Sequence, residues 1–501
     1  MPLHRSLDRP IRGKATALYW LHTCSIVKMP VHVQDKKGTT KRMIPLSRHP
    51  SREKGRIGFL GICRRLIWAS WLWLLIASIA ISSSHWNMAI LTLTWAAFAY
   101  FVTPQESGPK YGLDSKFSIS SDKFLSSIVG TTGVPFVKGN CVSILNNGNE
   151  FYPAMLEAVE QARHSITIEA YIYWAGSIGH RFASALAEKA RSGVIVKILL
   201  DAVGSSTIGK EILDTLQSAG CQVAWFNPVR WRTIGRYNNR THRKSLIIDG
   251  RIVFTGGAGI ADHWLGNAED AKHWRDLQIR VEGPASIALQ TGFAQNWLKT
   301  TSELISGPEY FPTLTTSNGI AVQTVLSSPE VGASALRIMY YLSIVCAQQK
   351  LYIANPYFIP DNAAIDILID ARKRGVDVKI MVAGIHNDMK LARYSSVHLY
   401  GKLLECGIEI YEYNRTMLHH KTMVADSAWI TVGTTNFDNR SFALNEESNV
   451  CVYDRTLAGE LEDIFKTDLE ACNQVQLETW KRRGLLTKMC GAASCFLKDQ
   501  I

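Results

Sequence analysis

One short phrase occurs twice in this chain of 501 residues, and the repeat restricts the possible folds more than any other feature. Both copies fit the pattern H-x-K-x4-D, and the second begins 177 positions after the first. The copies consist of His242, Lys244 and Asp249, and of His419, Lys421 and Asp426. A repeat of this length is a domain and not a short solenoid unit. The sequence therefore predicts two similar domains that each supply half of one active site.

The local sequence predicts that each copy lies on a strand that leads into a hairpin. Residues 245–248 and 422–425 are short apolar runs, which are typical of buried strands. Because alternate strand residues share a face, the His and Lys of each copy are expected to project together. Asp249 and Asp426 follow at the turns. Two roles remain open for these aspartates: binding of nearby backbone, or a direct part in the chemistry.

The surroundings of the two copies also match. Small residues follow each hairpin, at 256–259 and 433–436, and glycine-rich turns can hold phosphate oxygens with their N–H groups. Upstream, residues 182–191 and 363–374 are predicted helices, each followed by a glycine and an apolar strand. The alternation of strands and helices predicts an α/β sandwich with a mainly parallel sheet.

With these motifs the chain resembles the phospholipase D superfamily, and within it the bacterial cardiolipin synthases. The resemblance covers roughly residues 140–476. Besides the two repeated phrases, it rests on Gly433-Thr-Thr-Asn436-Phe-Asp-Asn-Arg440-Ser441, Asn355-Pro-Tyr-Phe-Ile-Pro-Asp361 and Ser441-Phe-Ala-Leu-Asn445-Glu-Glu447. The resemblance implies two tandem α/β sandwich domains of the phospholipase D type that form a pseudo-dimer.

The resemblance also implies how the site residues act. One motif histidine attacks phosphorus and the other protonates the leaving alcohol, with His242 as the nucleophile and His419 as the acid. The resemblance implies that Lys244, Lys421 and Asn436 bind the phosphate. It implies that Asp276 and Glu447 orient the histidine rings. The first copy departs from the family pattern, because Gly259 stands where an Asn is often found. A symmetric phosphate cradle is therefore not expected.

These residue types suit the transfer of a phosphodiester. An anionic phosphodiester repels a nucleophile, and two lysines offset that charge, so the resemblance implies neither a metal ion nor a cofactor. A neutral histidine can attack while a protonated partner acts as the acid. The hydroxyl that enters second decides the product, because water gives hydrolysis and a lipid glycerol gives transfer. Most of the 14 histidines are expected to be ordinary residues, and His420 is expected to point away from its neighbour His419.

The net charge of +12 belongs to one end of the chain. Residues 1–65 hold 15 Lys and Arg but three Asp and Glu, whereas the two signs balance in the remainder, which argues against a catalytic domain that binds nucleic acid. Two apolar runs follow, at 66–82 and 88–102, and predict a transmembrane helical hairpin. The predicted organisation is a basic tail (1–57), this hairpin (58–104), a linker (105–135) and two phospholipase D-like domains (136–315 and 316–501).

The basic residues before the first apolar run predict the orientation in the membrane. By the positive-inside rule the N-terminus stays in the cytoplasm, and two crossings return the catalytic halves to the same side. We therefore expect a multi-pass protein of the inner (plasma) membrane. The alternative is a pair of core helices. The ten cysteines are scattered without a C-x2-C pair, which disfavours zinc.

The leading hypothesis is a membrane-bound phosphatidyltransferase that joins two phosphatidylglycerol molecules into cardiolipin and releases glycerol. The second is a phospholipase D hydrolase that releases phosphatidic acid, and a nuclease is a weaker alternative. A catalytically dead, membrane-anchored scaffold is a further alternative, for which Gly259 is the support. The expected partners are a phospholipid and the membrane, and the sequence does not predict an oligomeric state.

Overall fold

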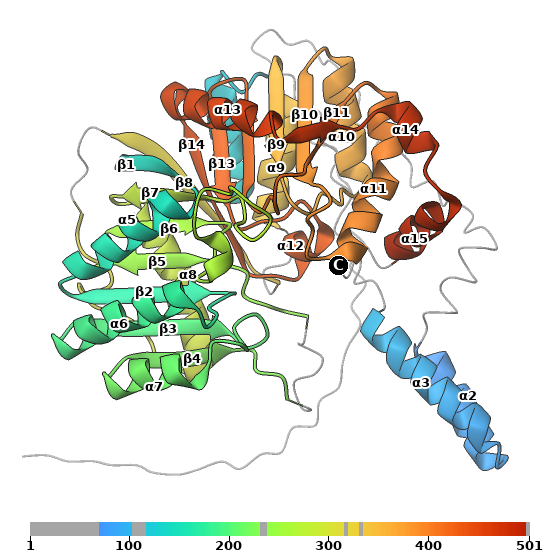
Figure 1. Ribbon diagram of the computed structural model, residues 1–501, viewed down its shortest axis with the longest axis horizontal. Coiled ribbons are helices and arrows are strands. Elements are labelled where there is room, and N and C mark those ends of the chain that lie inside the picture. The colour runs from blue at the N-terminus through green and yellow to red at the C-terminus, as the bar shows by residue number, and fades with distance from the viewer. Residues whose placement is uncertain (1–69, 103–116, 231–237, 315–318, 330–333, 497–501) are drawn as a thin grey trace, which may run out of the picture. The chain divides into compact units, whose positions relative to one another are not determined.

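The computed structural model describes residues 70–102, 117–230, 238–314, 319–329 and 334–496 (Figure 1). The predicted basic tail lies outside these residues. The first half contains β1 (Val137–Asn146), β2 (Ser165–Ala170), β3 (Ile195–Asp201), β4 (Gln222–Phe226), β5 (Ser245–Ile248), β6 (Ile252–Gly256) and β7 (Leu277–Glu282), with α5 (Gly148–Gln161), α6 (Ser177–Arg191), α7 (Lys210–Ser218) and α8 (Ser286–Thr301).

The second half repeats this set of elements. Its strands are β8 (Ile320–Ser327), β9 (Lys350–Ala354), β10 (Asp377–Ala383), β11 (Glu409–Tyr413), β12 (Lys421–Ala425), β13 (Trp429–Gly433), β14 (Glu447–Tyr453) and β15 (Cys472–Gln474). Its helices are α9 (Ala335–Cys346), α10 (Asn362–Lys373), α11 (Lys390–Glu405), α12 (Asn439–Ala443), α13 (Arg455–Leu469), α14 (Leu477–Lys481) and α15 (Leu485–Phe496).

The strand order is symmetric about the β1–β8 pair. The first half runs β4-β3-β2-β5-β6-β7-β1, and the second runs β11-β10-β9-β12-β13-β14-β8, with β15 added at its edge. The prediction of a mainly parallel sheet is wrong. Among the named strands of the described residues, the parallel pairs are β2–β3, β3–β4, β9–β10 and β10–β11, and the other neighbours are antiparallel. The tight motif hairpins force antiparallel neighbours, and these hairpins occupy the middle of each half.

The predicted motif strands and helices are confirmed. β5 and β12 match the predicted runs to within one residue, and the hairpins β5–β6 and β12–β13 pair as expected. Helices α6 and α10 also match, although α6 begins five residues before the predicted start at residue 182. The carboxylate of Asp262 explains that early start, because it accepts hydrogen bonds from the backbone N–H groups of Ser177 and Ile178, both at 2.9 Å.

Both motif aspartates hold backbone at the hairpin turns. Asp249 and Asp426 each have a φ of +51°, a conformation that Asp tolerates better than most residues. Asp249 Oδ1 accepts from the N–H of Ser165 at 2.9 Å, and Asp426 Oδ1 accepts from that of Lys350 at 3.1 Å. Each carboxylate thus joins its turn to the start of the neighbouring strand. Of the two roles left open, the geometry supports the structural one.

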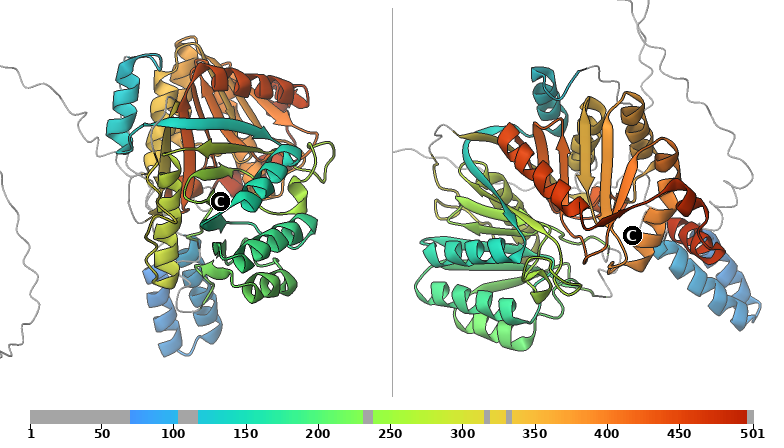
Figure 2. Two further views of the ribbon diagram at one scale, coloured as in Figure 1. Left: turned by 90° about the vertical axis from the view of Figure 1, so that its left-hand side faces the viewer. Right: turned by 45° about the horizontal axis from the view of Figure 1, so that its top comes forward.

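One hydrophobic cluster joins the two halves. Buried side chains from β6 and β7, among them Val253 and Val281, belong to the same cluster as Ile430 and Val450 from β13 and β14. Helices α8 and α13 add to this cluster, and Figure 2 shows α13 lying across the strands of the second half. Because burying such side chains stabilises by about 1.5–3 kcal/mol each, the halves hold each other in a fixed arrangement.

The predicted linker contains a helix, α4 (Asp122–Thr132). Its Phe124 and Ile128 are fully buried and pack with α9 of the second half, so this segment is not only a connection into the first half. Their four-residue spacing places both on one helix face.

The predicted hairpin corresponds to α2 (Ser70–Ser82) and α3 (Trp86–Val102). The two helices pack together, with the rings of Trp73 and Trp95 in edge contact at 6.0 Å. Within the residues that the structure describes, no helix has both the length and the apolar character that crossing a membrane requires.

Candidate active site

Each motif histidine is paired with a carboxylate from the other half. His242 Nδ1 lies 2.9 Å from Glu447 Oε1, and His419 Nδ1 lies 2.9 Å from Asp276 Oδ2. Both carboxylates are fully buried. A hydrogen bond at Nδ1 fixes the ring orientation and leaves Nε2 as the nitrogen that can react.

Backbone hydrogen bonds between the halves produce this crossed arrangement. The N–H of His242 donates to the carbonyl of Glu446 at 2.9 Å, next to the Glu447 that orients the His242 ring. In the same way the N–H of His419 donates to the carbonyl of Arg275 at 2.8 Å, next to Asp276. Isolated parallel bridges, Thr241 with Glu446 and Arg275 with Leu418, mark the two crossing points.

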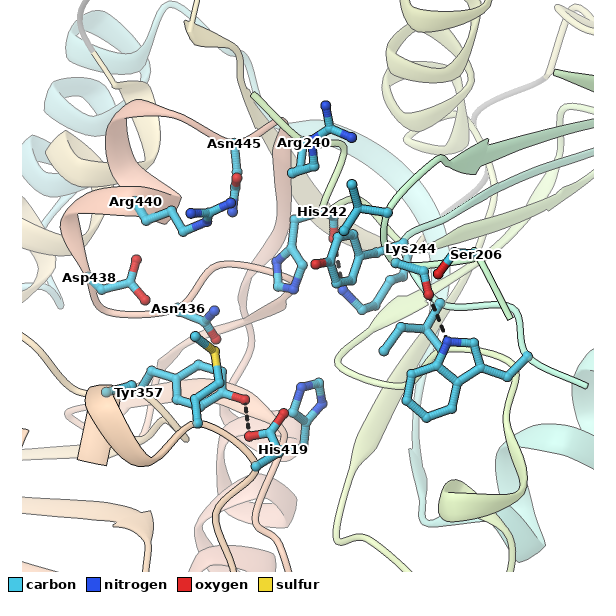
Figure 3. Close-up of a pocket in the computed structure, with 18 of the residues that line it drawn as sticks. Ser206, Arg240, His242, Lys244, Tyr357, His419, Asn436, Asp438, Arg440 and Asn445 are labelled. Atoms are coloured by element: carbon cyan, nitrogen blue, oxygen red, sulfur yellow. Dashed lines mark hydrogen bonds between the residues drawn. The ribbon is translucent and has the colours of Figure 1, made fainter. Parts of the chain in front are cut away.

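Both histidines line one cavity of about 490 Å³ (Figure 3). Both halves contribute to its walls. The first half supplies the aromatic residues Tyr171, Trp174 and Trp274 together with polar residues such as Asn238 and Arg240, and the second half supplies Tyr357 and the polar residues Asn436, Asp438, Arg440 and Asn445. Met389 and Ala392, at the start of α11, complete an apolar part of the lining.

The two motif lysines are buried and hydrogen-bonded to the motif backbone. Lys244 Nζ donates to the carbonyl of His242 at 3.0 Å, and Lys421 Nζ donates to that of His419. Burial and the nearby charge of Lys421 lower the pKa of Lys244 to about 7, and burial lowers the pKa of Lys421 to about 8. Because like charges in a desolvated site repel each other, this pair favours an anionic ligand.

The two histidine–carboxylate pairs differ in their protonation. Burial and the charges of Lys244 and Lys421 hold the pKa of His242 well below its usual value, and burial lowers the pKa of His419 to about 4. Burial raises the pKa of Glu447 to about 7. For Asp276, burial opposes ionisation, but the hydrogen bond and charge of His419 outweigh it and lower the pKa. His419 therefore faces the more firmly ionised carboxylate.

The halves also differ in what supports each carboxylate. Thr434 Oγ1 donates to Glu447 Oε2 at 2.5 Å, whereas the indole N–H of Trp264 donates to Asp276 Oδ2 at 2.9 Å. The first half has Gly257 at the place of Thr434, where a Cβ would lie 2.3 Å from Asp276 Oδ1. The Trp264 indole in the first half and the Thr434 hydroxyl in the second thus each donate a hydrogen bond to the carboxylate that orients a histidine.

Gly259 occupies the place that Asn436 has in the second half. A Cβ at Gly259 would lie 2.7 Å from the carbonyl oxygen of Ile172 and 3.2 Å from the Trp264 ring, so no side chain fits there. Asn436 in contrast lines the cavity, and its Oδ1 is buried without a hydrogen-bond partner among the described residues. The expected lack of a symmetric cradle thus has a steric origin.

The structure brings most of the predicted residues together. The cavity is lined by His242, Lys244, His419 and Asn436. Lys421 donates to the backbone of His419. Asp276 and Glu447 are hydrogen-bonded to the histidine rings. Asp249 and Asp426 are not among the cavity residues, so a direct part in the chemistry, one of the two roles considered for them, finds no support in the geometry. His420 points elsewhere, toward Asp468 at 3.4 Å.

Several lining residues were not assigned roles from the sequence. Arg440 and Asn445 lie inside phrases that carry the resemblance, so position within a motif was a signal that could have found them. Tyr171, Trp174 and Trp274 belong to no repeated phrase, and only the folded arrangement brings them to the cavity.

Two tandem α/β halves, with crossed histidine–carboxylate pairs at one cavity and a buried lysine in each motif, define a phospholipase D-type protein. A family model described as "Cardiolipin synthase, PLD-like domain" matches residues 155–276 and 343–469. The chain belongs to this cardiolipin synthase family of phospholipase D-like proteins.

Individual relatives agree with this assignment. The chain is 36% identical over 357 residues to a cardiolipin synthase of Geobacillus sp. (strain WCH70), covering 71% of each chain. It is 35% identical over 344 residues to cardiolipin synthase 2 of Bacillus anthracis, covering 68% of this chain and 67% of the relative. Among solved structures, phosphatidylserine synthase of Haemophilus influenzae Rd KW20 has a TM-score of 0.60 at 15% identity, covering 76% of this chain and 100% of that one, and thus shares the fold.

Proposed function

We propose that this chain is a membrane-bound phosphatidyltransferase that forms cardiolipin from two molecules of phosphatidylglycerol and releases glycerol. The observation that carries the proposal is the meeting of two crossed histidine–carboxylate pairs at one cavity, with Lys244 in its lining and Lys421 buried against the backbone of His419. The names of the relatives, cardiolipin synthases at 35–36% identity, support the choice of lipid product.

The reaction proceeds in two displacements at phosphorus. His242 Nε2 attacks the phosphorus of the first lipid, the bond to the glycerol oxygen breaks, and His419 gives that oxygen a proton. A hydroxyl of the second lipid then loses its proton to His419 and attacks the phosphohistidine, which frees His242 and completes the new phosphodiester. Lys244 and Lys421 stabilise the charge on the phosphate oxygens in both steps.

The unequal environments of the histidines support His242 as the nucleophile. Burial and three positive charges, those of Lys244, Lys421 and Arg440, lower the pKa of His242 and keep its ring neutral and able to attack. His419 faces the ionised Asp276, which stabilises a protonated ring. A bound phosphate adds negative charge near His419 and raises its pKa from about 4 toward the range in which it can act as an acid.

Membrane attachment is part of the same proposal. Large apolar side chains on α2 and α3 are exposed, among them Leu74, Ile79, Trp86, Ile90 and Leu91. Lys and Arg dominate residues 1–65, which supports a cytoplasmic N-terminus and cytoplasmic catalytic halves at the plasma membrane. Fractionation of cells that express the chain tests the attachment, and protease access from each side tests the orientation. Recovery of the full chain in the fraction without membranes would refute the attachment.

A product assay tests the enzymatic proposal. The full chain is expressed in a cardiolipin-free membrane that contains phosphatidylglycerol, beside a His242→Ala control. We expect cardiolipin and free glycerol from the first and neither from the second. Phosphatidic acid as the sole product would favour the hydrolase, and no histidine-dependent product would favour the scaffold.

A further inference from the structure

A buried arginine lies behind each of the two orienting carboxylates, and both arginines belong to the first half. Arg243 directly follows His242, and Arg275 directly precedes Asp276. The two arginines are 2% and 3% exposed, and neither is among the residues that line the cavity, so any effect they have on the reaction is indirect. Because a buried cation is costly unless it is paired, the partners of each arginine indicate what it does.

Arg275 holds the backbone of Asp276 in two ways. Its Nη1 donates to the carbonyl oxygen of Asp276 at 2.9 Å and to Asn147 Oδ1 at 3.0 Å. The same Asn147 Oδ1 accepts from the N–H of Asp276 at 3.3 Å. Both backbone polar groups of the residue that orients His419 are thus tied to one guanidinium, one of them directly and the other through an amide.

The other edge of the Arg275 guanidinium is anchored in the second half. Its Nε donates to Asp468 Oδ1 at 2.7 Å, on helix α13, and both side chains are buried. His420 Nε2 lies 3.4 Å from the second oxygen of Asp468. Burial opposes the ionisation of Asp468, but the charge of Arg275 and the contact with His420 outweigh it and lower its pKa. An ionised carboxylate of the second half therefore fixes the direction of the guanidinium that holds Asp276.

Arg243 makes the corresponding contacts behind Glu447. Its Nε donates to the carbonyl oxygen of Glu447 at 3.3 Å, and its Nη2 donates to Glu446 Oε2 at 2.9 Å. Further hydrogen bonds join Nη1 to the carbonyl of Gly292 at 3.0 Å and Nη2 to that of Ser327 at 2.9 Å. Each of the two arginines thus donates to the backbone carbonyl of one orienting residue and forms an ion pair with a carboxylate of the second half.

These contacts bear on catalysis because a carboxylate can orient a ring only if its own backbone is fixed. A misplacement of about 1 Å in an active site can cost about 100-fold in rate. We propose that Arg275, through Asp276, positions the histidine that acts as the acid and the base. Arg243, through Glu447, positions the nucleophile. The inference rests on the proposed function, from which it takes the roles of the two histidines.

The two arginines should affect different steps of the reaction. Glycerol is a poor leaving group and needs a proton from His419, whereas nitrophenol leaves without an acid. Loss of Arg275 should therefore slow the release of glycerol and spare the release of nitrophenol. Loss of Arg243 should slow both, because both need the nucleophile His242. A role in stability alone would not distinguish the two leaving groups.

The test uses the full chain in phosphatidylcholine vesicles that carry either phosphatidylglycerol or phosphatidyl nitrophenol. Exchange of labelled glycerol into phosphatidylglycerol measures a reaction that needs the acid, and nitrophenolate release in the first turnover measures the attack alone. For Arg275→Gln we expect exchange to fall at least about tenfold more than nitrophenolate release. For Arg243→Gln the two rates should fall together. The matched control is Lys197→Gln, which alters a buried cation of the first half paired with Glu303 at 2.7 Å and should keep the wild-type ratio of the two rates.

Variants of the same size keep the result interpretable if the arginine variants fold poorly, since removal of one partner of a buried ion pair destabilises a fold. Asp468→Asn and Glu446→Gln each remove the charge that anchors one arginine, and they should reproduce the two patterns more weakly. Equal losses of exchange and nitrophenolate release in Arg275→Gln and Asp468→Asn, or no loss in any variant, would overturn the positioning roles. A wild-type chain that gives neither glycerol exchange nor a labelled phosphohistidine would instead overturn the proposed function.

Discussion

The two halves have the same strand order and the same His/Lys phrase, yet the residues that follow the hairpins differ. After its hairpin the first half has Gly257 and Gly259, and Trp264 fills the space and supports Asp276. The second half has Thr434 and Asn436 in those places, followed by the polar segment that lines the cavity. The repeat thus preserved the backbone that positions the histidines, while the residues after the hairpins diverged. The first half has glycines that leave room for packing, and the second has Asn436, which lines the cavity.

The largest expected effect separates the two histidines. His242→Ala should reduce cardiolipin formation by roughly 10⁴-fold or more, because no nucleophile remains. His419→Ala should be similarly poor with phosphatidylglycerol. With a phosphodiester that has a nitrophenol leaving group it should still form the covalent intermediate, since that leaving group needs no acid. Trapping a labelled phosphohistidine checks this difference, and a label on His242→Ala but not on His419→Ala would reverse the assignment.

The next largest loss of activity is expected when either of the two orienting carboxylates is replaced by an amide. Asp276→Asn should lower kcat by roughly 10³-fold, because its carboxylate is ionised and stabilises the protonated His419. Glu447→Gln should cost roughly tenfold less, because burial has already raised the pKa of Glu447 to about 7. Steady-state kinetics of glycerol exchange measure both losses. Equal losses would mean that the two pairs act alike.

A smaller effect, on stability and on phosphate binding, is expected when the residues at the corresponding positions 259 and 436 are exchanged. Gly259→Asn should destabilise the fold by about 1–3 kcal/mol, because even a Cβ there meets Ile172 and Trp264. Asn436→Gly should change stability less but should weaken phosphate binding. Thermal unfolding and the KM for phosphatidylglycerol separate the two outcomes. A Gly259→Asn protein as stable as wild type would contradict the steric account.

The pH dependence gives the smallest and most specific effect. The pKa values of Lys244 and Lys421 are lowered to about 7 and about 8, so both lysines bind anions when protonated at lower pH and lose that ability as the pH rises through these values. We expect kcat/KM for glycerol exchange to fall between about pH 7 and 8. Lys244→Arg should shift this limb upward because a guanidinium stays charged. A profile that stays flat to high pH would contradict the assignment.

The sequence predicted the local features of the site, such as its hairpins. It could not predict features that depend on hydrogen bonds between residues far apart in the chain. Periodicity and turn residues located the β5–β6 and β12–β13 hairpins, although His242, Lys244 and His419 lie just before these strands and not on them. The early start of α6 depends on Asp262, which lies 85 positions away from Ser177. The pairing of each ring with the opposite half likewise depends on hydrogen bonds such as His242 to Glu446, for which no local pattern exists.

The crossed pairs also set a condition on how the enzyme becomes active. His242 depends on Glu447 and His419 on Asp276, so neither half carries a complete histidine–carboxylate pair of its own. A newly made first half would hold a histidine without its carboxylate until the second half had been synthesised and docked. Each oriented histidine therefore forms only when both halves have been translated and have packed together.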